Sequence, residues 1–267
     1  MNHDVRIKPG SSVKLADIDP RDTKFVGDEA LARQQLAEDV AAIDRLQDRL
    51  YAESNRALLI ILQGMDTSGK DGTVRGVFNT TGPMGVTVTP FRAPSSDELR
   101  RDFLWRAHQA VPRKGMIGIF NRSHYEDVLV ARVRKLVPHS VIDERYAQIN
   151  AFETLLSETG TVILKFMLHI SKDEQKLRLQ ERLDDPKKRW KFQPADLEDR
   201  AKWHEFREAY ELMLEKCSTD HAPWHIIPAD HKWARNAAIA KIVRAELEAM
   251  DPHYPVPNWS PDQFVIV

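Results

Sequence analysis

The sequence predicts an α/β fold in which a parallel β-sheet lies between two layers of helices. Five short apolar runs alternate with stretches of helical periodicity, which is typical of parallel strands joined by crossover helices. A glycine-rich loop that ends in a lysine directly follows the first apolar run, as in phosphate-binding α/β proteins. No internal repeat, low-complexity tract or long linker divides the 267 residues, so we expect one large domain.

The chain begins with a predicted arm and a long helix. Residues 1–27 contain Pro, Gly, Ser and Asp without apolar periodicity, and we expect them to pack on the body or on a neighbouring subunit. From residue 28 to about residue 54, apolar residues recur every three or four positions, which predicts a packing helix.

The first strand, at residues 57–62, leads into Gly-Met-Asp-Thr-Ser-Gly-Lys-Asp-Gly at 64–72. Gly64, Gly69 and Lys70 have the G-x-x-x-x-G-K spacing of a phosphate-binding loop. Backbone N–H groups must approach a phosphate closely there, so glycine is favoured, and the lysine adds positive charge. An ordinary glycine-rich turn is the alternative, but it leaves the lysine unexplained.

The residue after Lys70 departs from the usual motif. It is Asp71, where the common pattern has a Ser or Thr whose hydroxyl binds Mg²⁺, so other groups must hold the metal. A helix can open at residues 72–79 with its N-terminus toward the anion. The residues predicted to bind phosphate in this loop are Gly64, Thr67, Ser68, Gly69, Lys70, Asp71 and Gly72.

The rest of the chain continues the alternation. The later strands are predicted at residues 86–90, 114–120, 161–168 and 224–228. The later helices are predicted from a capping box at Ser95 and Glu98 to about Ala110, as one helix or a pair at 126–158, after a cap at Ser171, and from Lys232 to about Met250. Ligands of such a sheet gather at the carboxyl ends of its strands, where three charged segments follow, at 64–72, 121–127 and 176–191.

The second charged segment reads Asn-Arg-Ser-His-Tyr-Glu-Asp at 121–127. Asp127, or its neighbour Glu126, is placed to hold Mg²⁺ opposite the loop lysine. Arg122 could reach a phosphoryl group in transfer. The alternative is that Asp127 caps the following helix and that Arg122 pairs with it at the surface.

The third charged segment is strongly basic. Arg178 and Arg182 are four residues apart, so a helix places them on one face, and Asp-Asp-Pro at 184–186 ends that helix. A cationic segment with a hinge suits a mobile lid over phosphates, whereas a merely solvated helix face is the alternative. Its seven basic residues are Lys176, Arg178, Arg182, Lys187, Lys188, Arg189 and Lys191.

Three motifs together resemble the polyphosphate kinase 2 family. They are the loop at 64–72, Phe-Asn-Arg-Ser-His-Tyr-Glu-Asp-Val at 120–128 and Asp-Pro-Lys-Lys-Arg-Trp-Lys at 185–191, and the resemblance covers about residues 30–250. It implies a three-layer P-loop kinase fold of the thymidylate-kinase type with a helical lid. It also implies reversible transfer of the terminal phosphoryl group of inorganic polyphosphate to a nucleotide, with Mg²⁺ as the metal and Mn²⁺ as an alternative.

Two details refine the resemblance. An aspartate after the loop lysine is typical of the family, so Asp71 supports the assignment. The sequence His-Tyr-Glu-Asp at 124–127 resembles the class III type, which accepts both AMP and ADP, whereas other subgroups tend to read Trp-Tyr-Asn-Arg or Trp-Tyr-Gly-Arg there.

The resemblance and the charge pattern assign roles to the candidate residues. The predicted catalytic residues are Asp66, Lys70, Arg122, Asp127 and Arg182, and the predicted metal ligands are Asp66, Glu126 and Asp127. The predicted track for the polyphosphate chain is Arg178, Lys187, Lys188 and Lys191. By analogy with nucleoside monophosphate kinases, the predicted nucleotide-binding residues are Thr81, Gly82, Pro83, Met84, Gly85 and Phe91.

The composition limits which partners and covalent cross-links we expect for this protein. The formal net charge of −1 points to neither nucleic acid nor membrane, and the single Cys217 rules out an intrachain disulfide. We expect a cytoplasmic homo-oligomer, a dimer or a tetramer, with an arm at 1–27, a kinase domain at 28–250, a lid at about 171–200 and a tail at 251–267. The alternatives are an ATP-dependent nucleoside monophosphate kinase and a non-catalytic P-loop module that binds phosphate or nucleic acid.

Overall fold

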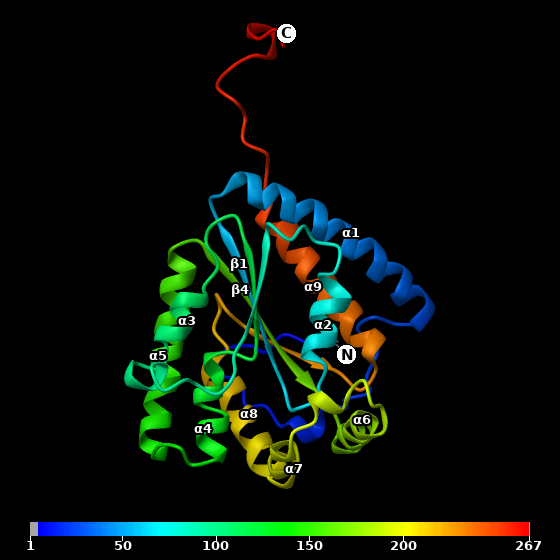
Figure 1. Ribbon diagram of the computed structural model, residues 1–267, viewed down its shortest axis with the longest axis vertical. Coiled ribbons are helices and arrows are strands. Elements are labelled where there is room, and N and C mark those ends of the chain that lie inside the picture. The colour runs from blue at the N-terminus through cyan, green and yellow to red at the C-terminus, as the bar shows by residue number, and fades with distance from the viewer. Residues whose placement is uncertain (1–4, 267) are drawn as a thin grey trace.

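A computed structural model, which describes residues 5–266, confirms the predicted α/β architecture. Its five strands are all parallel and lie in the order β2-β3-β1-β4-β5 (Figure 1). The strands are β1 (Ala57–Gln63), β2 (Val86–Pro90), β3 (Ile117–Asn121), β4 (Thr161–His169) and β5 (Trp224–Pro228). The first strand is therefore the central one, and the loop that follows it starts at the middle of the sheet.

Helices cover both faces of the sheet (Figure 1). They are α1 (Glu29–Glu53), α2 (Lys70–Val77), α3 (Trp105–Ala110), α4 (Val130–Val133), α5 (His139–Glu158), α6 (Lys172–Asp184), α7 (Pro194–Ala201), α8 (Trp203–Cys217) and α9 (Lys232–Met250). One apolar core joins the sheet to α1, α2 and α9, and the other joins it to α3, α4, α5 and α8. Every residue of β1 is buried, which explains why this strand reads as an unbroken apolar run.

The N-terminal arm packs on the body of the protein. The backbone N–H of Ile7 donates to the carbonyl of Trp224 at 2.8 Å, and that of Ile226 donates to the carbonyl of Val5 at 2.8 Å. Leu15 is buried in the core on the α5 and α8 side. The arm therefore runs beside β5, which is one of the two outer strands of the sheet.

The predicted helix at 95–110 is wrong in its middle. The capping box is present, because the N–H of Ser95 donates to Glu98 and the N–H of Glu98 donates to Ser95 Oγ. However, only a short 3-10 turn, Glu98–Arg100, follows it before α3 begins. Asp102 Oδ1 accepts the N–H of Leu104 at 3.0 Å, and this local bond competes with a continuous helix.

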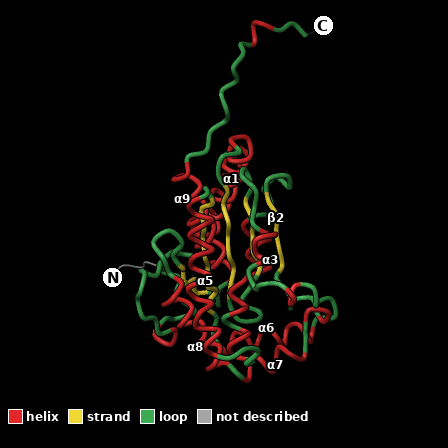
Figure 2. The backbone as a smooth tube through the Cα atoms, turned by 90° about the vertical axis from the view of Figure 1, so that its left-hand side faces the viewer, coloured by secondary structure: helices red, strands yellow, loops and turns green. Residues whose placement is uncertain are grey.

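The segment after β4 and the C-terminal segment complete the fold. Residues 171–200, predicted as a lid, form α6, the 3-10 turn η4 (Arg189–Lys191) and most of α7, whereas α8 was not predicted. After α9, Pro252 is buried and Tyr254 Oη donates to Asp48 of α1 at 2.6 Å, and the residues that follow, up to 266, project away from the body (Figures 1 and 2). Between residues 5 and 266, no helix has the length and apolar character needed to cross a membrane.

Candidate active site

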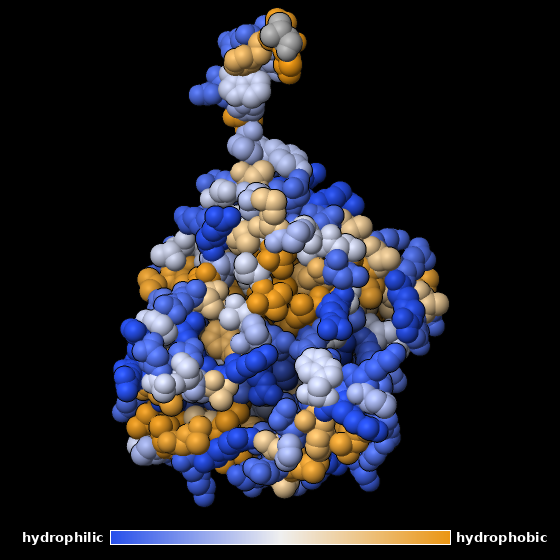
Figure 3. Space-filling view, viewed as in Figure 1, coloured by the Kyte–Doolittle hydropathy of each residue, from blue (hydrophilic) through white to orange (hydrophobic). Residues whose placement is uncertain are grey.

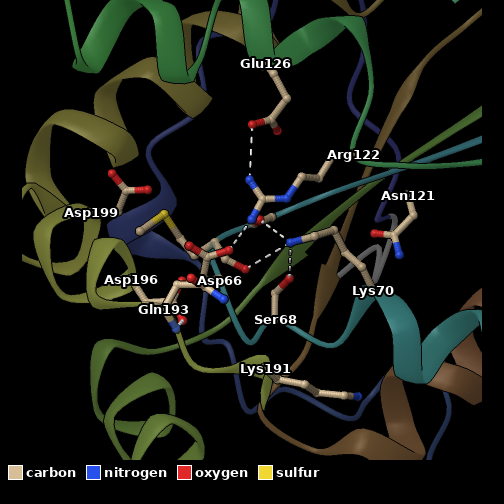
Figure 4. A network of polar contacts seen from close by, with 12 residues as sticks. Asp66, Ser68, Lys70, Asn121, Arg122, Glu126, Lys191, Gln193, Asp196 and Asp199 are labelled. Carbon is tan, nitrogen blue, oxygen red and sulfur yellow. Dashed lines mark hydrogen bonds and ion pairs between the residues drawn. The ribbon is translucent and has the colours of Figure 1, made fainter. Parts of the chain in front are cut away.

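The structure brings the three predicted charged segments together at the carboxyl ends of the strands. The loop at 64–69 follows β1, residues 122–127 follow β3, and α6 to α7 follow β4. Hydrophilic side chains surround a hollow near the middle of the face seen in Figure 3. The close view in Figure 4 shows residues of all three segments pointing toward one another. This convergence is what the position of polar residues after neighbouring strands predicts.

Two glycines of the loop stand where a side chain would collide with its surroundings. Gly64 has φ 151°, and a Cβ there would lie 2.7 Å from the carbonyl oxygen of Leu168. Gly69 has φ 105°, and a Cβ there would lie 1.7 Å from Nη1 of Arg235. The glycines are therefore required because the chain passes close to β4 and to an arginine of α9.

Lys70 folds back over its own loop. Its Nζ donates to the carbonyl of Gly64 at 2.7 Å and to that of Met65 at 3.2 Å, and the side chain is buried. Burial, together with the nearby charge of Arg122, lowers the pKa of Lys70 to about 8. The ammonium group thus lies inside the curve of the loop, where oxygen atoms of a bound phosphate would replace the carbonyl contacts.

Arg122 lies between two carboxylates (Figure 4). Its Nη2 contacts Asp66, and its Nη1 donates to Glu126 Oε2 at 3.2 Å. Glu126 Oε1 also accepts from Gln63 Nε2 at 3.1 Å, which ties the motif to β1. Glu126 and Asp66 raise the pKa of Arg122 despite its burial, so the guanidinium stays charged beside the loop lysine.

The predicted set of three metal ligands is not gathered in the structure. Asp127 Oδ1 accepts from Arg145 at 3.3 Å, and Oδ2 lies 3.5 Å from Nη2 of Arg106. Burial raises the pKa of Asp127, while these two arginines oppose that shift. Within the part of the chain that the structure describes, no three His, Cys, Asp or Glu side chains lie close enough to hold a metal. Asp127 therefore forms an ion-pair cluster, and neither pairs with Arg122 nor caps α4.

Two carboxylates still suit a magnesium ion. Asp66 and Glu126 both contact Arg122 beside the loop, and the second oxygen of Glu126 accepts from Gln63. Mg²⁺ in phosphoryl-transfer enzymes is usually held by one or two carboxylates and otherwise by water and substrate phosphates. The donor set at this position fits that pattern, and a full protein cage is not needed.

Arg178 does not line a track, contrary to the prediction. Its guanidinium is buried and donates to the carbonyls of Thr67 at 2.9 Å, Ala229 at 2.7 Å and Asp230 at 2.8 Å. Thr67 has φ 65°, a left-handed conformation that a non-glycine residue adopts only when its surroundings enforce it. Arg178 therefore braces the phosphate-binding loop from behind.

The lid residues contact the loop and one another. Lys191 Nζ lies 3.9 Å from Asp71 Oδ2, and Asn121 donates to the other oxygen of Asp71 at 2.7 Å. Arg182 donates to Asp196 at 3.3 Å. Lys188 pairs with carboxylates of its own segment, and Lys187 is exposed. Of the four residues predicted as a track, Arg178 contacts the loop from behind and Lys191 approaches it from the lid.

The predicted nucleotide-binding residues fall into two groups. Pro83 and Met84 are exposed, whereas Thr81 is buried and its hydroxyl donates to the carbonyl of Phe78 at 2.7 Å. Phe91 is buried in the core, with its ring centroid 4.7 Å from that of Phe120. The Phe91 ring therefore offers no free face to a base, which corrects its predicted role.

Sequence reasoning missed several residues of this site. Asp196 and Asp199 of α7 face it and are nearly buried, and burial and the nearby Asp66 raise the pKa of both. Asp196 lies in the first turn of α7, where acids are common because they complement the helix dipole, so the spacing of the two acids carries no special signal. Arg235 donates from Nη1 to the carbonyl of Ser68 at 3.3 Å, and no motif around it in the sequence indicates this contact either.

The comparison with known families decides the membership of this chain. The family model described as Polyphosphate kinase 2 (PPK2) matches residues 27–255. The chain belongs to the polyphosphate kinase 2 family. This confirms the family resemblance that the three sequence motifs predict.

Two curated relatives and one solved structure match almost the whole chain. It is 50% identical over 262 residues to an AMP/ADP-polyphosphate phosphotransferase of Meiothermus ruber, which covers 98% of both chains. It is 38% identical to an ADP-polyphosphate phosphotransferase of Rhodopseudomonas palustris, over 94% of this chain and 91% of that one. The crystal structure of polyphosphate kinase 2 from Arthrobacter aurescens TC1 superposes with a TM-score of 0.92 at 42% identity, over 97% of this chain and 93% of that one.

The buried charge of Lys70 makes the stability of the protein depend on pH. With its pKa lowered to about 8 in the folded state, Lys70 holds its proton less tightly there than in the unfolded chain, where the pKa is near 10.5. Below pH 8 the charged lysine lowers stability, and this effect disappears as the pH rises from about 8 to about 10.5. Relative to Lys70→Met, the parent should gain about 3 kcal/mol in the free energy of unfolding over that range.

Chemical denaturation of both proteins at about pH 7.5, 9 and 10.5 measures this difference. Taking the difference between parent and variant removes the titration of other groups. A constant difference across the range would show that the ammonium group is solvated in the folded protein.

Proposed function

We propose that this chain transfers the terminal phosphoryl group of inorganic polyphosphate to AMP and ADP, reversibly and with Mg²⁺. The observation that carries the proposal is the grouping of three cations around the loop that follows β1. Lys70 is buried inside the loop, Arg122 contacts Asp66 of the loop, and Lys191 of the basic lid lies 3.9 Å from Asp71. The names of relatives that match nearly the whole chain support the same donor and acceptors.

Phosphoryl transfer needs alignment and charge stabilisation more than covalent chemistry, and the residues present suit that task. Lys70 and the loop N–H groups would bind the phosphate at the transfer point. Arg122 and Arg182 would stabilise charge on the moving group after leaving Asp66 and Asp196, their present partners.

The metal part of the proposal uses two side chains. Asp66 and Glu126 would hold Mg²⁺, with Mn²⁺ as an alternative, once Arg122 turns toward the phosphate. The ion would supply positive charge that stabilises the phosphoryl group in transfer. Asp127 would instead keep Arg106 and Arg145 in place beside the motif.

The acceptor range is proposed from the motif at 124–127. His-Tyr-Glu-Asp is the form that resembles the class III type, which accepts both AMP and ADP. The exposed connector around Pro83 and Met84 is the proposed place for the nucleotide, and no side chain there marks a preference for one base. The proposal includes a homo-oligomer, a dimer or a tetramer, that works in the cytoplasm on free polyphosphate and not on nucleic acid.

The direct test is ATP formation from AMP or ADP with polyphosphate, measured with and without Mg²⁺. We expect turnover in the parent and a loss of roughly 10² to 10³ in rate for Lys70→Ala, because a preorganised charge at the transfer point is removed. Circular dichroism checks that the variant is folded. ATP as a good donor with polyphosphate inert would favour the ATP-dependent kinase, and phosphate binding without any transfer would favour the non-catalytic module.

The metal ligands can be separated by two matched variants. Asp66→Asn should raise the Mg²⁺ concentration needed for half-maximal rate by about tenfold, because Mg²⁺ loses a charged ligand. Asp127→Asn should keep the Mg²⁺ dependence of the parent, since its carboxylate pairs with Arg106 and Arg145. If Mg²⁺ titrations instead show a raised requirement for Asp127→Asn and an unchanged one for Asp66→Asn, Asp127 is a metal ligand and Asp66 is not.

The basic turn of the lid should act on the donor. Neutralising Lys187 and Lys188 to glutamine should weaken binding of long-chain polyphosphate and lower its salt dependence by about one to two in log–log slope, because fewer counterions are released. The KM for AMP should change little. Lys8→Gln with Lys14→Gln, an equal charge change on the exposed arm, is the control.

Steady-state kinetics at two salt concentrations measures both effects. Equal losses toward polyphosphate and AMP, with an unchanged salt slope, would mean that the turn orders the lid and does not bind the chain.

A further inference from the structure

A fully buried ion pair lies beneath the motif at 121–127, on the face of the sheet covered by α5 and α8. Lys165 of β4 and Glu153 of α5 have no exposed surface, and Lys165 Nζ lies 2.5 Å from Glu153 Oε2. Nζ also donates to Tyr125 Oη at 2.9 Å and to the carbonyl of Cys217 at 2.7 Å. The three N–H bonds of the ammonium group thus find three acceptors.

Two consecutive residues of the motif complete this network. Tyr125 Oη donates to Glu153 Oε1 at 2.8 Å, and His124 Nε2 lies 3.5 Å from the same oxygen. Burial and the Glu153 carboxylate raise the pKa of Tyr125, so its hydroxyl keeps the proton that it donates. Burial alone would raise the pKa of Glu153, but Lys165 and His124 lower it overall, so the carboxylate is ionised.

Stability does not explain why these charges lie in the core. Apolar residues of similar volume are often as stabilising as a buried ion pair, or more so, because two charges must leave water. Many apolar and aromatic side chains pack in the core on this face of the sheet. A buried polar network can instead specify one geometry, since each donor must face one acceptor.

The geometry that this network controls is that of the site residues in the same turn. Tyr125 points into the core, whereas its neighbours Arg122 and Glu126 face the phosphate-binding loop. Ser123 Oγ accepts the N–H of Tyr125 at 3.1 Å, and the carbonyl of Ser123 accepts that of Glu126 at 3.1 Å. Arg122 itself has φ 61°, which a non-glycine residue keeps only under such constraint.

We propose that Tyr125, Glu153 and Lys165 are positioning residues, which hold the turn 122–127 so that Arg122 and Glu126 meet the phosphate. All three side chains are fully buried, so none has a surface that a substrate could touch. The inference rests on the proposed function only in taking phosphate to be the ligand of Arg122, and it does not depend on the donor.

The first test removes one hydroxyl and keeps the ion pair. Tyr125→Phe should lower kcat by about 10- to 100-fold with KM values within about threefold, because a small displacement of Arg122 costs rate more than affinity for the ground state. Tyr146→Phe is the matched control, since Tyr146 is buried in the same core, on the same helix as Glu153, and lies outside the network. Its kcat should stay at the parent value, and equal losses in both variants would overturn the proposal.

The second test does not need turnover. The Kd of Mg²⁺-free tripolyphosphate is measured by titration calorimetry for the parent, Tyr125→Phe, Arg122→Ala and the double variant. If Tyr125 acts through Arg122, Tyr125→Phe should weaken binding by about threefold in the parent, in line with the small change in KM, and should not weaken it in Arg122→Ala. Thermal melts check that Tyr125→Phe stays folded, with a Tm lower by about 2–5 °C.

These four proteins form a double-mutant cycle, and two results of this cycle would overturn the proposal. One is an equal loss from Tyr125→Phe in both backgrounds, and the other is an Arg122→Ala protein that binds tripolyphosphate like the parent. A parent that binds tripolyphosphate but makes no ATP from polyphosphate would refute the proposed function alone, because the cycle would still decide the role of Tyr125.

Discussion

The buried ammonium group of Lys70, held by the carbonyls of its own loop, is the interaction on which the rest of this structure depends. A lysine inside a loop of backbone dipoles needs glycines at Gly64 and Gly69, because the chain must pass close to β4 and to Arg235. It also needs the central strand, whose carboxyl end carries the loop into the middle of the sheet. The cost of burying the charge is borne by the unligated protein, and a phosphate at the same place would offset it.

The charges around this loop largely neutralise one another in the structure. Arg122 contacts Asp66 and Glu126, Arg182 contacts Asp196, and Lys191 approaches Asp71. A site for a polyanion that exposed all these cations without partners would repel itself and lose stability. The carboxylates therefore neutralise these cations in the free protein, and two of them, Asp66 and Glu126, are the ligands that we propose for Mg²⁺.

The turn after β3 links this surface electrostatics to the core. Arg122 and Glu126 of this turn lie among the charges of the loop. In the core, Tyr125 is hydrogen-bonded to Glu153 and Lys165, and His124 lies beside Glu153. Three consecutive strands of the sheet thus contribute to one site: Gln63 from β1, the turn from β3 and Lys165 from β4. Gln63, the turn and Lys165 should tolerate little displacement, because the three strands that carry them belong to one hydrogen-bonded sheet.

The sequence by itself determined the strands, the loop and the last helix, Lys232–Met250, because apolar periodicity and glycine spacing are local properties of the chain. It also determined the family, since three motifs in order are specific. Only the tertiary structure decided that Arg178 braces the loop, that Phe91 lies in the core and that Asp127 pairs with Arg106 and Arg145. Whether a charged side chain or a ring faces a ligand depends on residues that are far away in the sequence. The local spacing of residues does not indicate such long-range contacts.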